Sequence, residues 1–148
     1  MSATFLVNFM RLALQKTGAE RAMAADGNLS IVATVNLEQA DLLSPQFTGI
    51  EVIRQALDEG EPIITNNAVM DPERAPVTNT SFSNLRVVVV IPAEEYGAVY
   101  LDQHIRMGVI PKEVVNRLWM VAEQAANNRQ TDISPEELEA LYRQVENL

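Results

Sequence analysis

The chain of 148 residues contains no cysteine and a single histidine, His104. The lack of cysteine excludes disulfides, thiolate zinc sites, iron–sulfur clusters, thioether-attached chromophores and cysteine nucleophiles. One histidine cannot build a multi-histidine metal centre, and a haem would have to rely on His104 alone. We expect His104 to face solvent after a strand, and we expect no metal and no cofactor.

Positive charge and long apolar runs are also scarce. The chain has 11 basic and 20 acidic residues and a formal net charge of −9, which repels nucleic-acid phosphates and anionic membranes. Asn8 and Arg11 interrupt the apolar N-terminal stretch, and no window approaches the roughly 20 apolar residues of a membrane span. The sequence therefore predicts a cytoplasmic protein with neither nucleic acid nor a membrane as its partner.

A recognisable catalytic constellation is missing too. There is no glycine-rich phosphate loop, and Asp102-Gln103-His104 is no triad without a positioned nucleophile. We therefore expect a protein that is not an enzyme. What the chain does have is an ordinary globular composition, with 47% apolar and 21% charged residues, enough for one domain with its own core.

Hydrophobic periodicity divides the chain into helices and strands. Apolar residues at helical spacing predict helices over residues 4–15, 50–60, 111–128 and 134–148. Runs rich in β-branched and aliphatic residues predict strands over residues 20–25, 29–35, 62–65, 85–91 and 96–101. Strands joined by tight turns form a mainly antiparallel sheet, and helices must cover its faces, so the predicted fold class is α+β.

Turn and cap residues support these boundaries. Asp26-Gly27 predicts a tight hairpin turn because glycine accepts positive φ, and Pro-Ala-Glu-Glu at 92–95 predicts another turn. Ser134 and Glu137 predict a capping box with Pro135 in the first turn of the last helix. Residues 66–84 are rich in Asn, Thr and Ser and predict a long loop, a kind of segment that is often functional.

The order of these elements, together with several local motifs, resembles the GAF domain, a family of small-molecule-binding and dimerising modules in signalling proteins. The matching stretches lie between Phe5 and Asn128. They are "LALQKTGAERAM", "GIEVIRQALDEGEPIITNNAVMDPE", "NLRVVVVIP" and "YGAVYLDQ". The order and spacing of these pieces carry the match, because each piece alone is degenerate.

The resemblance implies a GAF-like domain over residues 1–130 with an appended C-terminal amphipathic helix at 131–148. The 85–101 hairpin would form the middle of the sheet, the terminal helices would cover one face, and a helix with the long loop would cover the other. Any ligand pocket would lie between that loop and the sheet. The chain lacks the cysteines of bilin-binding members and of free-methionine sulfoxide reductases, and the Asn-Lys-Phe-Asp-Glu signature of cyclic-nucleotide-binding members is not recognisable, so the ligand stays open.

Five polar residues are candidates for ligand binding. Arg86 opens an apolar strand, and its guanidinium would suit a carboxylate or phosphate; alternatively it pairs with a surface acid such as Glu73, Glu94 or Glu95. The others could orient a small ligand or could satisfy the backbone of the loop. They are Asn66, Asn67, Thr80 and Ser81.

The first and the last two predicted helices carry more apolar surface than one sheet face needs. The surplus predicts a homodimer with a symmetric helix-on-helix interface, or simply intramolecular core. The residues expected at the dimer interface are Phe5, Phe9, Leu118, Trp119, Leu138, Leu141 and Val145.

Two functions follow as hypotheses. The first is a non-catalytic GAF-like sensory module that binds a small cytoplasmic molecule and acts through a homodimer or a regulatory protein partner. The second is a ligand-free dimerisation or protein-interaction domain.

Overall fold

The computed structural model describes residues 2–44, 47–66, 85–127 and 133–147. Its centre is a five-stranded sheet in the order β2-β1-β5-β4-β3, and every pairing is antiparallel. The strands are β1 (Arg21–Asp26), β2 (Ile31–Val35), β3 (Ile63–Asn66), β4 (Arg86–Ala93) and β5 (Gly97–His104). The predicted α+β class is confirmed. The predicted hairpin of β4 and β5 is antiparallel and central, because β5 is the middle strand of the sheet.

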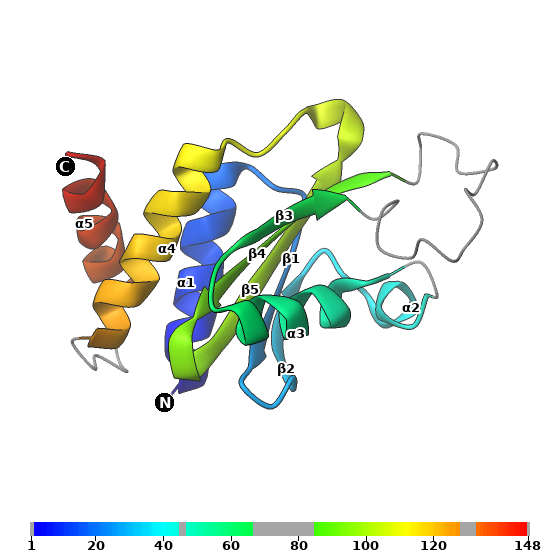
Figure 1. Ribbon diagram of the computed structural model, residues 1–148, viewed down its shortest axis with the longest axis horizontal. Coiled ribbons are helices and arrows are strands. Elements are labelled where there is room, and N and C mark those ends of the chain that lie inside the picture. Colours follow the sequence, from blue (N-terminus) through cyan, green and yellow to red (C-terminus); the bar gives the residue numbers. More distant parts are fainter. Residues whose placement is uncertain (1, 45–46, 67–84, 128–132, 148) are drawn as a thin grey trace.

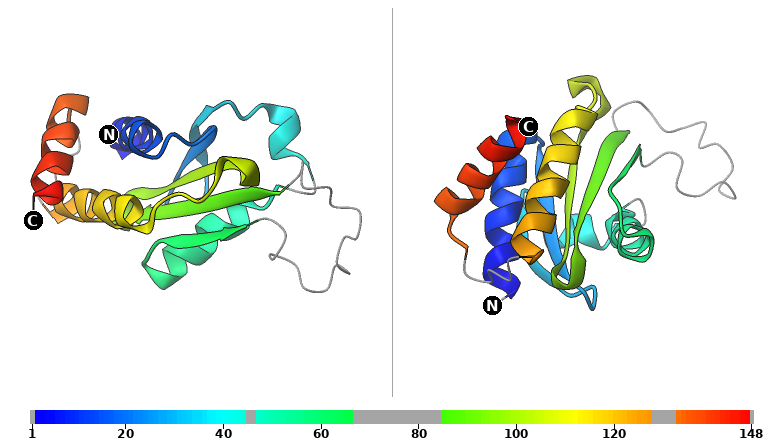
Figure 2. Two further views of the ribbon diagram at one scale, coloured as in Figure 1. Left: turned by 90° about the horizontal axis from the view of Figure 1, so that it is seen from above. Right: turned by 60° about the vertical axis from the view of Figure 1, so that its left-hand side comes forward.

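Helices cover both faces of the sheet, as Figures 1 and 2 show. Helices α1 (Ser2–Thr17) and α4 (Lys112–Asn127) pack on one face, and α3 (Gly49–Glu59) packs on the other. Helix α5 (Pro135–Glu146) packs against α1 and α4. It therefore shares the larger hydrophobic core with α1 and α4, whereas the sequence predicted a helix appended to the domain.

Alternating side chains of β4 and β5 supply both cores, because successive residues of a strand point to opposite faces. Val89, Ile91 and Leu101 belong to the cluster that includes α1, α4 and α5. Val90 and Tyr100 belong to the smaller cluster under α3. The sheet is thus buried on both faces, which explains the nearly unbroken apolar run of β4.

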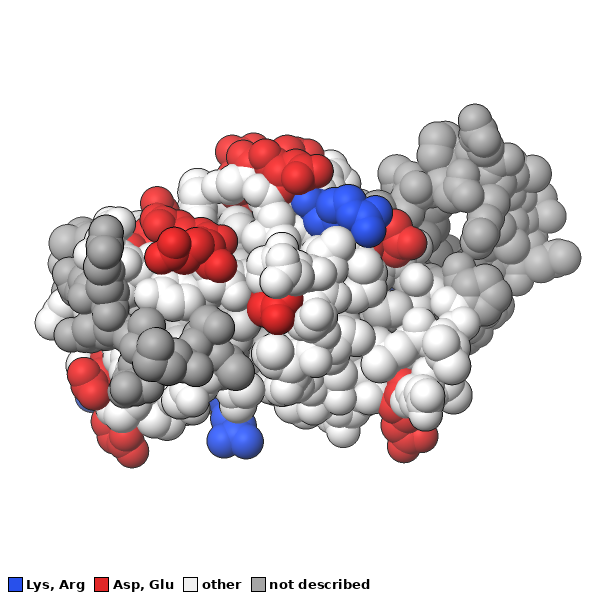
Figure 3. Space-filling view, turned by 90° about the horizontal axis from the view of Figure 1, so that it is seen from below, with Lys and Arg blue, Asp and Glu red and all other residues white. Residues whose placement is uncertain are grey.

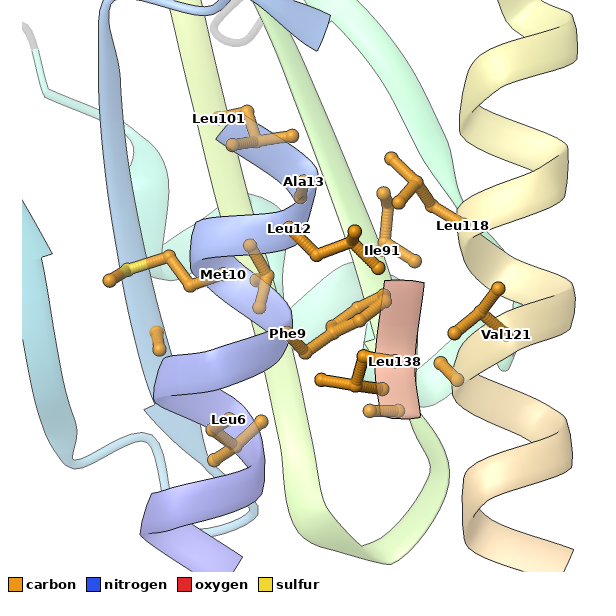
Figure 4. Packing of buried hydrophobic residues seen from close by; sticks show 14 of the residues in the cluster. Leu6, Phe9, Met10, Leu12, Ala13, Ile91, Leu101, Leu118, Val121 and Leu138 are labelled. Atoms are coloured by element: carbon orange, nitrogen blue, oxygen red, sulfur yellow. The ribbon is translucent and has the colours of Figure 1, made fainter. Parts of the chain in front are cut away.

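Five residues expected at a dimer interface lie inside the larger core. Phe5, Phe9, Leu118 and Leu138 are 0% exposed and Val145 is 5% exposed. Figure 4 shows Phe9, Leu118 and Leu138 converging from three helices near Ile91 of the sheet. Assigning these five to a dimer interface is corrected here, because packing within one chain already takes up their surface.

Two further residues of that set, Trp119 and Leu141, are partly exposed while packing on the same core. They stay candidates for a contact with a second copy. Within the part of the chain that the structure describes, no helix combines the length and apolar character that crossing a bilayer requires.

The first hairpin turn forms where expected but for another reason. Positive φ falls on Leu29, at 67°, and Gly27 is not among the residues with positive φ. The Asp26 carboxylate accepts hydrogen bonds from the N–H groups of Asn28 and Ser30, at 2.9 and 3.0 Å. The turn is therefore held by an aspartate side chain that bonds to the backbone.

The second hairpin turn is shorter than predicted, since Pro92 and Ala93 still belong to β4 and the turn is the 3₁₀ helix Glu94–Tyr96. The short helix α2 (Gln39–Leu42) was not predicted. The capping box of α5 is present: Glu137 N–H donates to Ser134 Oγ at 3.1 Å, and Ser134 N–H donates to Glu137 Oε1 at 3.3 Å.

Replacing Gly97 with alanine should destabilise the protein by roughly 3 kcal/mol. Gly97 has φ at 139°, and a Cβ there would lie 2.0 Å from the carbonyl oxygen of Ala25 on the paired strand. Gly108→Ala is the matched control, because φ is again positive, at 89°, but nothing lies within 4 Å. Urea unfolding of both variants checks this expectation, and equal losses would show that the close approach of β1 has no energetic effect.

Candidate functional site

The register of the sheet gathers charged residues at one end of its α3 face. Arg21 of β1 pairs with Asp102 of β5, and Arg86 of β4 pairs with His104 of β5. Tyr100 precedes Asp102 by two residues and therefore points to the same face. We call Glu20, Arg21, Arg86, Tyr100 and Asp102 the Asp102 cluster.

Asp102 is the centre of this cluster and is fully buried, at 0% exposure. The guanidinium of Arg21 binds it in a bidentate manner: Nε donates to Oδ1 at 2.8 Å and Nη2 donates to Oδ2 at 2.6 Å. The hydroxyl of Tyr100 donates to Oδ2 at 2.5 Å, and Arg86 Nη1 lies 3.4 Å from Oδ1. A buried carboxylate with this many donors has its desolvation cost offset by charge-assisted hydrogen bonds.

These contacts fix the protonation states of Tyr100 and Arg21. Burial, followed by the negative charge of Asp102 and the hydrogen bond to it, raises the pKa of Tyr100 far above its ordinary value. Burial alone would lower the pKa of Arg21, but its hydrogen bond to Asp102 and the charge of Asp102 raise it above its ordinary value. Tyr100 therefore remains a neutral hydrogen-bond donor and Arg21 remains a cation.

Glu20 closes the cluster on its solvent side. Its Oε1 accepts hydrogen bonds from Arg86 Nη1 at 2.9 Å and from the backbone N–H of His104 at 2.6 Å. The Glu20 backbone is held separately, since its N–H donates to the carbonyl oxygen of Asp102 at 3.0 Å and its own carbonyl accepts from Asn36 Nδ2 at 2.9 Å. The side chain of Glu20 is 39% exposed.

The cluster borders an apolar wall under α3. The rings of Phe47 and Tyr100 meet edge to face, with centroids 5.3 Å apart. Val52, Ile53 and Ala56 of α3 pack with the strands below. Among the residues that the structure describes, Thr48 Oγ1 is buried and has no hydrogen-bond partner. A few convergent polar groups beside apolar and aromatic side chains are the usual composition of a site for a small organic molecule.

The described residues hold no group of three or more His, Asp or Glu side chains suited to a metal ion. The ring of His104, the residue considered for haem, is half-buried, and its Nδ1 accepts a hydrogen bond from the N–H of Arg106 at 3.0 Å. The Asp102 cluster contains two guanidinium groups, a phenol and two carboxylates, and these groups can form hydrogen bonds and ion pairs with a ligand.

Of the residues predicted for ligand binding, Arg86 lies in this cluster, where Glu20 and Asp102 are among its acidic partners. Glu94 and Glu95, two of the partners that the sequence suggested, lie in the turn at the opposite end of β4. Asn66 ends β3 and pairs with Val87, one residue from Arg86. Asn67, Thr80 and Ser81, like Glu73, lie outside the described residues.

Sequence reasoning missed Glu20, Arg21, Tyr100 and Asp102 as members of one site. A signal was present, because Arg21 and Asp102 are opposite charges at the margins of otherwise apolar strands. Charged residues seldom enter such strands without a partner. Only the register of β1 against β5 shows that these two are partners.

A concave surface lies between α1 and α5, away from the Asp102 cluster, and has a volume of about 510 Å³. Leu12 and Ala140 are among its apolar lining residues, and Arg11 and Glu136 are among its charged ones. Glu139 also lines it and receives a hydrogen bond from Lys16 Nζ at 2.8 Å. Lys16 Nζ lies 4.7 Å from the centroid of the Tyr142 ring, which ties α5 further to α1.

The Lys16–Glu139 pair should make part of the stability depend on pH. The hydrogen bond from Lys16, with its charge, lowers the pKa of Glu139. A carboxylate whose folded pKa is lowered stabilises the protein above its unfolded pKa, and this contribution is lost as pH falls through the folded pKa. We expect Glu139→Gln to cost about 0.5 kcal/mol at pH 7 and less below about pH 4.

Thermal unfolding between pH 3 and pH 7 measures this difference. Glu136→Gln on the same helix is the control, because Glu136 is exposed. A loss for Glu139→Gln that stays the same at every pH would contradict the electrostatic origin.

The exposed surface carries mostly negative charge. Figure 3 shows acidic side chains predominating over basic ones on one side of the molecule. On α3, Glu51, Asp58 and Glu59 are exposed beside Arg54. In the Asp102 cluster, by contrast, the two guanidinium groups are paired with the carboxylates of Asp102 and Glu20.

Comparison of the chain with family models, with curated proteins and with solved structures found no match.

Proposed function

We propose that the chain is a non-catalytic, GAF-like signalling module that binds a small molecule at the Asp102 cluster and acts through a homodimer or a regulatory protein partner. The supporting observation is the cluster itself. Two arginines, a neutral tyrosine and a buried aspartate converge at the end of an otherwise apolar sheet face. The resemblance in motif order between residues 5 and 128 supports the GAF-like part of the proposal.

The position of the cluster favours a signalling role. It ties together three neighbouring strands: Arg21 belongs to β1, Asp102 to β5 and Arg86 to β4. On the opposite face of the same strands, α1 and α4 pack on Val89 and Leu101. A ligand that changes how these strand ends pair would shift the population of helix arrangements on the other face.

Native mass spectrometry of the protein purified from its own source tests the proposal. A stoichiometric small molecule that is lost in Arg86→Gln and retained in the exposed-surface variant Arg54→Gln would support it. Protein that carries no small molecule in any preparation, together with no change in amide chemical shifts of the cluster on addition of a metabolite mixture, would overturn it.

A ligand-free interaction domain is the second candidate, favoured by a separate observation. The space between α3 and the sheet is filled in the described region by buried side chains such as Met23, Val52 and Ile53. Exposed apolar residues lie elsewhere: Met107 is 53% exposed and Val109 is 79% exposed. Sedimentation equilibrium distinguishes this candidate, because a dimer that carries no ligand favours it and a ligand-bearing monomer argues against it.

A further inference from the structure

The Glu20 carboxylate occupies a position in which two strong donors converge. Arg86 Nη1 and the His104 N–H both reach Oε1, at 2.9 and 2.6 Å. A guanidinium beside a backbone N–H binds an anion, because both groups donate and one of them carries positive charge. This arrangement would hold any carboxylate placed there, whether or not it belongs to the chain.

Glu20 and Asp102 differ in how firmly the fold holds their carboxylates. Asp102 is fully buried and is bonded by Arg21, Arg86 and Tyr100. Within the described part of the chain, the hydrogen bonds to the Glu20 carboxylate reach one oxygen, Oε1, and its side chain is 39% exposed. Its main chain is anchored through the N–H and carbonyl groups, so the side chain can rotate into solvent without disturbing the strand.

We propose that Arg86 and the His104 N–H form a carboxylate-binding site that Glu20 masks, and that the ligand is a small organic carboxylate that takes the place of the Glu20 side chain. This inference rests on the proposed function and specifies its ligand class. The exchange conserves charge in the site, because one carboxylate replaces another. The side chains of Arg86 and Glu20 are 22% and 39% exposed, so the ion pair between them is in contact with solvent.

The neighbouring Asp102 favours a carboxylate over inorganic phosphate. Asp102 Oδ1 lies 3.4 Å from the same Arg86 Nη1 that binds Glu20. An anion in the Glu20 position is therefore close to a second negative charge, and a dianion is repelled more strongly than a monoanion. The net charge of −9 adds to this preference.

A masking side chain lowers the apparent affinity for the ligand by the fraction of molecules in which the site is open. Removing Glu20 should therefore tighten binding. We expect acetate, at constant ionic strength, to shift the His104 amide resonance of Glu20→Ala saturably, with an apparent dissociation constant at least 5-fold lower than in the unaltered protein. Glu51→Ala removes an equal charge from the exposed side of α3 and should leave the dissociation constant unchanged.

Two further variants and two control ligands keep the test decisive. Glu20→Gln preserves the length of the side chain and should also bind acetate more tightly than the unaltered protein, which provides an answer if Glu20→Ala fails to fold. Glu20→Ala combined with Arg86→Gln should lose the saturable shift. Phosphate or acetamide titrated into Glu20→Ala should bind more weakly than acetate. The proposal is overturned if neither Glu20 variant shows a saturable shift, if the shift survives Arg86→Gln, or if phosphate binds more tightly.

Native mass spectrometry separates this inference from the proposed function. A recovered small molecule without a carboxylate would overturn the inference and leave the sensory function standing. Acetate binding that depends on Arg86, in a protein from which no small molecule is ever recovered, would support the carboxylate site and argue against the sensory function.

Discussion

Asp102→Ala should lower the free energy of unfolding by about 3 kcal/mol. The substitution leaves Arg21 and Arg86 without the buried carboxylate that both contact, and it leaves the Tyr100 hydroxyl without its acceptor. Removing one partner of a buried charge pair is costly because the other charge stays desolvated. The two arginine side chains are 19% and 22% exposed, so partial access to water places the loss at the lower end of the usual range.

Urea unfolding measures the loss, and Asp58→Ala is the control. Asp58 is an exposed acid on α3, where such a substitution changes stability by no more than about 0.5 kcal/mol. Asp102→Asn should lie between the two, because the amide retains the shape and one acceptor but not the charge. A loss below about 1 kcal/mol for Asp102→Ala would mean that the cluster contributes little to the fold.

Phe9→Ala should cost about 4 kcal/mol. Phe9 is fully buried, and its ring stacks on that of Phe5 with centroids 5.8 Å apart and an interplanar angle of 8°. Removing the ring leaves a cavity among α1, α4 and the sheet that well-packed neighbours cannot fill. Because these contacts lie within one chain, the loss should be the same at every protein concentration.

Chemical denaturation at two concentrations a hundredfold apart makes the measurement, with Leu141→Ala as the comparison. Leu141 is partly exposed on α5 while it packs on the same core. If a homodimer forms through this surface, Leu141→Ala should change the concentration dependence of unfolding. A concentration-dependent loss for Phe9→Ala would show that Phe9 also contributes to an interface between copies.

The fold class could be predicted from local patterns, because the spacing of apolar residues along a short segment distinguishes a helix from a strand. The helix stop at Gly60, with φ at 72°, and the capping box of Ser134 and Glu137 formed as predicted. The short helix α2 was missed because it has no buried residue among Gln39–Leu42, so no apolar pattern marks it. Strand β4 runs on to Ala93 and β5 to His104, beyond their predicted ends at residues 91 and 101, because their pairing extends from Arg86 and His104 to Ala93 and Gly97.

The site was less predictable because it depends on pairing between distant strands. Arg86 could be chosen from its own neighbourhood, but Arg21 and Asp102 are 81 residues apart in sequence. The assignment of Phe5 and Leu138 to a dimer interface failed for a related reason. An amphipathic helix shows which face is apolar, but only the packing of α1, α4 and α5 shows what covers that face.

The strand order has a consequence for how the chain acquires its structure during synthesis. The central strand β5 is made after the other four, yet it pairs with both β1 and β4. Until the ribosome has released Gly97–His104, the apolar residues Ala22–Ala25 of β1 have a bare hydrogen-bonding edge, and the nascent chain cannot close its sheet. Long-range pairing of this kind slows folding and leaves aggregation-prone edges open for longer. The nascent chain therefore carries an unpaired strand edge until its last strand has been made.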